Sequence, residues 1–153
     1  MPQLEPERFQ FTSADGLSIA CVKWSGHHPV RGVVQIAHVL GEHMGRYTEI
    51  AETLVHEKLV VYGNNHRGHG LTAKASGSFG EFGLGGFNQL VEDMLRLQVI
   101  AKKEHPGKPY ILLGHAKRTK ICALTARLLH CCYHKRSTLR AISLIGLPGP
   151  KSC

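Results

Sequence analysis

The chain has 153 residues, of which 42% are hydrophobic, and its formal net charge is +8. This length suits one domain, and no apolar run approaches the roughly 20 residues of a membrane-spanning helix. The first residues lack the basic and apolar regions of a signal peptide, and five cysteines without framework spacing favour reduced thiols. We therefore expect a cytoplasmic protein, with peripheral attachment to a membrane as the alternative.

The charge is distributed unevenly along the chain. All eleven acidic residues lie at or before Glu104, whereas nine of the nineteen Lys and Arg follow it. Four of the five cysteines also lie late in the chain, at Cys122, Cys131, Cys132 and Cys153. Three interpretations of this basic segment stay open: a tail for nucleic acid or anionic lipid, a solvated helix face, or a change of reading frame or of selection near residue 115.

The early part of the chain predicts an antiparallel hairpin. Phe9 and Phe11 alternate with polar residues, and an Asp-Gly turn at 15–16 precedes a second alternating run over 17–22. Three short runs are almost continuously apolar, as is typical of strands that are buried on both faces. These predicted strands cover residues 33–37, 59–62 and 110–113.

Helices are predicted between these strands and after them. Apolar residues recur at helical spacing over 46–57, 87–101 and 119–133, and a last strand is expected over 139–145. Residues 63–86 contain eight glycines and are expected to form a long loop. A hairpin followed by alternating strands and helices predicts an α/β fold with a mostly parallel sheet.

Three loops leave the carboxyl ends of the predicted strands, where ligands bind in open α/β sheets. Their sequences are HVLGEHMGRY at 38–47, NHRGHG at 65–70 and GHAKR at 114–118. The third has the setting of a nucleophile elbow, a sharp strand-to-helix turn with the sequence Gly-x-Ser-x-Gly. Ala116 stands where the serine is expected, and Arg118 replaces the closing glycine.

In this order and spacing, the three motifs resemble the α/β-hydrolase superfamily. Within it they are similar to the monoacylglycerol lipase and lysophospholipase group, also called serine aminopeptidase S33-type hydrolases. The resemblance runs from about Phe9 to His115. It implies one partial α/β-hydrolase-like domain over 1–153, truncated after about the sixth strand, with a family-like part at 1–115 and a divergent basic part at 116–153.

The resemblance also implies an activity and a set of site residues. The activity is hydrolysis of the carboxylic ester of a monoacylglycerol or lysophospholipid through an acyl-serine, without a cofactor. The nucleophile position is Ala116, and the oxyanion-hole donors are the backbone N–H groups of Leu40 and Lys117. Further residues match family positions and are expected to organise the loops: His38, Gly41, Glu42, His43, His66, Arg67, His69 and His115.

Several departures from the family pattern argue against catalysis. Ala116 has no hydroxyl, Val39 replaces a glycine, and Asn64-Asn65 stands where Pro-Asp is usual. The Asp and His of the family triad follow later strands, which the sequence does not reach. We therefore predict a protein that is not a competent hydrolase. The alternatives are a binding or regulatory protein that uses the basic segment on an anionic partner, and a gene remnant that folds poorly.

Other candidate chemistry is weaker. Ser76-Gly77-Ser78 faintly resembles an elbow, but no predicted strand leads into it, and Cys122 suits a helix core. In the cluster 130–134, adjacent cysteines on a helix point about 100° apart, so no metal site is expected. The basic segment contains one aromatic residue, Tyr133, and no recognition motif, so nucleic-acid binding is not expected. No oligomeric state is predicted.

Overall fold

The structure, a computed structural model, describes residues 4–114 and 139–143. These residues form one six-stranded sheet in the order β1-β2-β4-β3-β5-β6. The strands are β1 Glu7–Thr12, β2 Ser18–Trp24, β3 Gly32–Ala37, β4 Leu59–Asn64, β5 Tyr110–Gly114 and β6 Leu139–Ser143. The helices are the 3₁₀ helix η1 Met44–Tyr47 and the α-helices α1 Thr48–His56, α2 Gly70–Ser76 and α3 Gly86–Glu104.

The sheet is mixed and mostly parallel. β1 pairs antiparallel with β2, and β2 pairs antiparallel with β4. The remaining pairs, β3 with β4, β3 with β5 and β5 with β6, are parallel. The N-terminal hairpin and the α/β class predicted from the sequence are therefore confirmed.

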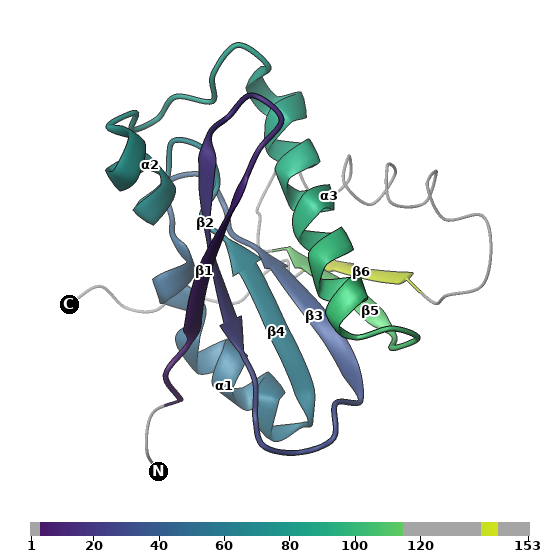
Figure 1. The fold of residues 1–153 in the computed structure, drawn as a ribbon. Coiled ribbons are helices and arrows are strands. Elements are labelled where there is room, and N and C mark those ends of the chain that lie inside the picture. The colour runs from purple at the N-terminus through teal and green to yellow at the C-terminus, as the bar shows by residue number, and fades with distance from the viewer. Residues whose placement is uncertain (1–3, 115–138, 144–153) are drawn as a thin grey trace.

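Helices cover both faces of the sheet, with α3 on one face and α1 on the other (Figure 1). Successive side chains of a strand point to opposite faces. Val34 and Ile36 accordingly join the core cluster of α1, whereas Val33 packs in the cluster that contains Leu97 of α3. Every residue of β3 is buried, which explains why the sequence of this strand is almost continuously apolar.

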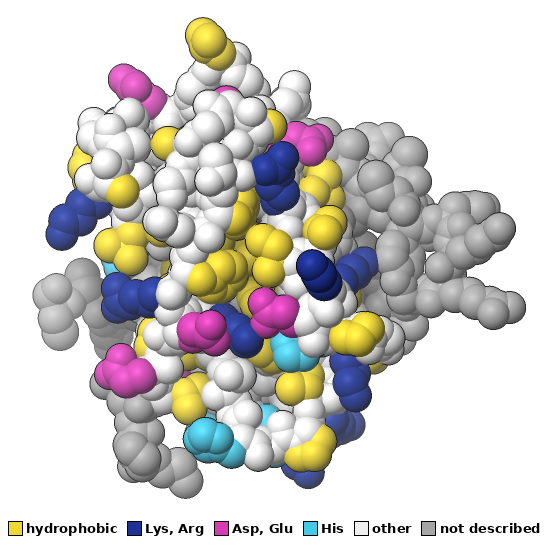
Figure 2. Space-filling view, in the orientation of Figure 1, with side chains coloured by type: hydrophobic (Ala, Val, Ile, Leu, Met, Phe, Trp, Pro, Cys, Tyr) yellow, Lys and Arg dark blue, Asp and Glu magenta, His cyan; other side chains and the backbone are white. Residues whose placement is uncertain are grey.

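Strand β1 packs against the core on the side of the sheet that α3 covers. Phe9 and Phe11 are half-buried and pack against the cluster of α3, and the Phe9 ring meets Tyr62 edge-on at 6.4 Å. Hydrophobic side chains are visible between the β1–β2 hairpin and α3 in the space-filling view (Figure 2). This contact fixes the hairpin to the rest of the sheet.

The prediction of a long loop over 63–86 is wrong in one respect, because the helix α2 lies within this segment. This helix has seven residues and no apolar stripe, so periodicity does not reveal it. Tertiary contacts stabilise it instead. The buried Thr72 hydroxyl donates to the Asn65 carbonyl at 2.7 Å and accepts the Ala20 N–H at 3.0 Å.

The helix predicted over 46–57 begins as η1 and continues as α1, and the helix predicted over 87–101 extends as α3 from Gly86 to Glu104. The predicted strands agree with β3 to β6 to within two residues at either end. The helix predicted over 119–133 and the domain boundary at residue 115 lie outside the described residues, as do Cys122 and the cluster at 130–134. No described helix combines the length and apolarity needed to cross a bilayer.

Candidate functional site

The loops that carry the three motifs follow the carboxyl ends of three adjacent parallel strands, β4, β3 and β5. In the parallel register, Ala37 at the end of β3 lies beside Gly114 at the end of β5. On the other side of β3, Ile36 lies beside Gly63, shortly before the end of β4. The carboxyl ends of β3, β4 and β5 therefore bring loops 38–47 and 65–70 to the point where β5 ends.

His38 and His66 join two of these loops. Both side chains are buried, and their ring centroids lie 4.0 Å apart. The backbone N–H of His66 donates to His38 Nε2 at 2.9 Å, and His66 Nε2 donates to the His38 carbonyl at 3.1 Å. These reciprocal hydrogen bonds fix the peptide that leads from β3 into loop 38–47.

The hydrogen bonds also assign the protonation of these rings. His38 Nε2 accepts a hydrogen bond, so the proton is on Nδ1, which donates to the Val39 carbonyl at 2.9 Å. Burial lowers the pKa of His38 to about 4, and burial together with the neighbouring histidines lowers the pKa of His66. Both imidazoles are therefore neutral at pH 7, with fixed tautomers.

Loop 38–47 turns sharply after Val39. The Glu42 N–H donates to the Val39 carbonyl at 3.1 Å, and Gly41 occupies the left-handed region with φ +85°. Among the described residues, the Leu40 N–H has no hydrogen-bond acceptor. This N–H is the one that the family resemblance assigns to an oxyanion hole, and that role stays a prediction.

Glu42 fixes the second half of the same loop. Its carboxylate accepts the Tyr47 hydroxyl at 2.6 Å and an Arg46 N–H at 3.3 Å. The Tyr47 ring is buried beneath α1. Glu42 thereby connects the exposed turn to the core of the α1 face.

Arg67 occupies a buried ion-pair network that sequence analysis did not find. Its Nε donates to Asp93 at 2.5 Å, its terminal nitrogens donate to Asp15 at 2.6 and 2.8 Å, and one of them also donates to Ser13 at 2.7 Å. Asp93 is 1% exposed and belongs to α3, where it interrupts the apolar stripe. An acidic residue between the buried Leu90 and Met94 was the one signal in the sequence.

The remaining predicted residues are placed differently. His69 donates through Nδ1 to the Arg67 carbonyl at 2.7 Å, and its ring lies 5.6 Å from that of His38. The His43 side chain lines a cavity beside η1. His115, Ala116, Lys117 and Arg118 lie outside the described residues.

Asn64 and Asn65, which depart from the family pattern, are both buried. Asn65 Oδ1 accepts the Met44 N–H at 3.1 Å and so connects the end of β4 to η1. Asn64 Nδ2 donates to His66 Nδ1 at 3.3 Å, whereas Asn64 Oδ1 has no partner among the described residues. Within residues 4–114, no group of three or more His, Cys, Asp or Glu side chains is arranged to hold a metal ion.

Residues 28–130 match the family described as serine aminopeptidase, S33. The chain is 35% identical to human monoglyceride lipase over 115 residues, which is 74% of this chain and 36% of that protein. It is 37% identical to the monoacylglycerol lipase of Mycolicibacterium smegmatis over 106 residues, which is 69% of this chain and 36% of that protein. The chain thus spans little more than a third of the length of these relatives.

The fold comparison agrees with the sequence comparison. A thermostable carboxyl esterase from Bacillus coagulans superimposes with a TM-score of 0.79 and 28% identity, over 90% of this chain and 44% of that one. A monoglyceride lipase from Saccharomyces cerevisiae superimposes with a TM-score of 0.62 at 24% identity, which shows the shared fold. The chain belongs to the serine aminopeptidase S33 family of α/β-hydrolases.

Proposed function

We propose that this chain is a non-hydrolytic member of its family, with a strand-edge site related to those of monoacylglycerol lipases. The observation that carries the proposal is Ala116, which stands at the nucleophile position of the elbow motif. A methyl group cannot form an acyl-enzyme, and loss of the nucleophile costs a serine hydrolase about 10⁶ in turnover. The substrate class that the family relationship suggests for the site is a carboxylic ester such as a monoacylglycerol.

Three serine hydroxyls among the described residues do not offer a substitute nucleophile. The Ser76 hydroxyl donates to the Thr72 carbonyl at 3.0 Å, and the Ser78 hydroxyl donates to the Ser76 carbonyl at 3.5 Å. Ser13 donates to Asp93 and accepts from Arg67. Within the described residues, none of these three hydroxyls has a hydrogen bond to a histidine, which is the usual activating base.

The proposal is tested by assaying the purified chain on a short-chain nitrophenyl ester and on a monoacylglycerol. Human monoglyceride lipase, assayed in parallel, provides the positive control. We expect no turnover above that of the buffer. Turnover that disappears after treatment with a fluorophosphonate would contradict the proposal, and Ser76→Ala and Ser78→Ala variants would then locate the nucleophile.

The charge distribution supports a second candidate function. The residues after Glu104 contain nine basic and no acidic residues, which favours contact with an anionic surface. Binding to vesicles that contain an anionic phospholipid should then fall steeply between 50 and 200 mM salt. Absence of binding at 50 mM salt would remove this candidate and leave the first one untouched.

A further inference from the structure

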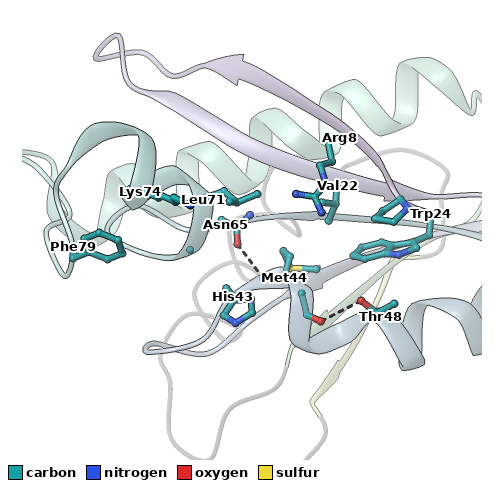
Figure 3. A pocket seen from close by; sticks show the side chains of 13 residues that line it. Arg8, Val22, Trp24, His43, Met44, Thr48, Asn65, Leu71, Lys74 and Phe79 are labelled. Carbon is teal, nitrogen blue, oxygen red and sulfur yellow. Dashed lines mark hydrogen bonds between the residues drawn. The ribbon is translucent and has the colours of Figure 1, made fainter. Parts of the chain in front are cut away.

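A cavity of about 410 Å³ lies between the β1–β2 hairpin, η1 and α2 (Figure 3). Its volume falls in the range of small-molecule sites, roughly 300–1,000 Å³. Its lining includes neither His38 nor Leu40 nor Gly114. The cavity shares His43 and Asn65 with the two motif loops, but it does not include the residues at the predicted oxyanion hole.

The floor of the cavity is apolar and consists of buried side chains. Val22 and Trp24 of β2 and Met44 of η1 line it, and each of these side chains is at most 5% exposed because it also belongs to the core beneath α1. Leu71 of α2 and Phe79, which follows this helix, add exposed apolar walls. Such a surface suits an alkyl or aryl group.

The rim of the cavity is cationic. Arg8 of β1 and Lys74 of α2 line it, and no acidic residue does. Within the described residues, neither Arg8 nor Lys74 forms an ion pair or a side-chain hydrogen bond. Two unpaired cations beside one cavity favour an anionic group there.

Asn65 adds a neutral donor at the same place. Its side chain is buried, and its oxygen is occupied by the Met44 N–H. Its Nδ2 has no hydrogen-bond partner among the described residues. Figure 3 shows Asn65 and Arg8 among the side chains that line the cavity, together with Val22 and Met44. Three residues with side-chain donors thus line a cavity whose floor is apolar.

We propose that this cavity binds a small amphiphile with one anionic head group and one alkyl chain. The head group accepts hydrogen bonds from Arg8, Lys74 and the Asn65 amide, and the alkyl chain lies on Val22, Trp24 and Met44. A carboxylate and a phosphate monoester share this chemistry. Neither hydrolysis nor the basic segment is needed for such binding.

The chain contains one tryptophan, Trp24, so its fluorescence reports on the cavity directly. We would titrate the full chain with octanoate and with octyl phosphate below their micellar concentrations, and confirm the binding by calorimetry. Octanol and octylamine provide neutral and cationic probes of the same chain length. We expect saturable binding of at least one anionic probe, and the stronger of the two identifies the head group.

Substitutions test the contacts. Arg8→Gln and Lys74→Gln should each weaken binding of the anionic probe by about tenfold, because a charge-assisted hydrogen bond is lost. Asn65→Asp keeps the shape and the acceptor for the Met44 N–H but places a carboxylate at the cavity, so it should weaken binding at least as much. Arg31→Gln removes an exposed charge away from the cavity and should have no effect.

Two results would overturn the proposal. The first is that neither anionic probe binds, and the second is that octanol binds as tightly as the anionic probes. Arg8 and Lys74 are exposed, so their substitution should leave the fold intact even if Asn65→Asp does not fold. Circular dichroism of each variant separates loss of binding from loss of structure.

Discussion

At the scale of single residues, two neutral imidazoles connect the loops of the candidate site. His38 and His66 exchange hydrogen bonds that require one acceptor nitrogen on the His38 ring and one N–H on the His66 ring. Protonation of His38 would remove the acceptor for the His66 N–H. The structure of this edge is therefore coupled to pH.

We expect the free energy of unfolding to fall as the pH is lowered through the range in which the unfolded chain gains protons. The pKa of His38 is about 4 in the folded chain and 6.5 in the unfolded chain, so the unfolded state binds more protons between these values. The contribution is present above pH 6.5 and is lost as the pH falls towards 4. By linkage, the titration of His38 alone should lower the free energy of unfolding by about 2 kcal/mol between pH 7.5 and pH 5.

Urea unfolding at pH 7.5 and pH 5 measures this loss. His38→Gln should show a smaller loss than the unsubstituted chain, because one of the buried imidazoles is gone. His27→Gln, which changes an exposed histidine, should retain the full loss. An equal loss in all three proteins would show that His38 is not responsible.

Breaking the buried ion pair between Arg67 and Asp93 should strongly destabilise the fold. Replacement of Arg67 by Met would leave Asp93 buried without its cation, which typically costs about 3–5 kcal/mol. Adding Asp93→Asn should recover part of that loss, since the buried charge is then removed. Arg46→Gln breaks an exposed ion pair with Glu42 at 3.3 Å and should cost less than about 1 kcal/mol.

Chemical denaturation of the unsubstituted chain, Arg67→Met, Asp93→Asn, the double variant and Arg46→Gln tests this ordering. A loss of less than about 1 kcal/mol for Arg67→Met would mean that the network contributes no more than a surface ion pair. Full additivity of the two core substitutions would contradict the direct contact between Arg67 and Asp93.

The motif residues at this edge could be predicted from the sequence, but their partners could not. The spacing of the histidines within 38–47 and 65–70 identifies the loops because each motif is local. The network of Arg67 joins residues 52 and 26 positions away, and Ser13 meets Asp93 across 80 positions. Nothing in a local pattern specifies pairs at such separations.

At the scale of elements, two glycines in the segment after β4 have left-handed backbone conformations. Gly68 has φ +70°, and a Cβ atom at this position would lie 2.7 Å from both the N and the O of Glu81. Gly77 ends α2 with φ +74°, and a Cβ atom there would meet nothing within 4 Å. The two glycines share a conformation but differ in their surroundings.

Alanine substitutions separate conformation from contact. Gly77→Ala should cost about 1 kcal/mol, because only the left-handed backbone is penalised. Gly68→Ala should cost clearly more, because backbone atoms of Glu81 must also move. Thermal unfolding compares the two variants, and equal melting temperatures would contradict the close approach of residues 68 and 81.

The buried strands and the two longer helices could be predicted because burial imposes a continuous or periodic apolar pattern on them. The helix α2 could not, because Thr72 and its contacts with Ala20 and Asn65 stabilise it. The same long-range packing creates the cavity beside Trp24. The residues that line the cavity come from β1, β2, η1, α1, α2 and the loops beside them.

At the scale of the whole molecule, we propose that the chain keeps the family fold without the family's hydrolytic chemistry. The described residues form the hairpin and parallel strands of an α/β-hydrolase, and loops 38–47 and 65–70 meet at the end of β5. After β5, Ala116 and Arg118 stand at the positions that the family resemblance assigns to the nucleophile and to the closing glycine. If these assignments hold, the chain is a family scaffold that cannot form an acyl-serine.

Intact-protein mass spectrometry after incubation with a fluorophosphonate tests this claim most directly. The reagent forms a covalent adduct with an activated serine and leaves unactivated hydroxyls unmodified. We predict that the mass of the chain stays unchanged under conditions in which human monoglyceride lipase is fully modified. A stoichiometric adduct on one serine of this chain, mapped by peptide sequencing, would contradict the account.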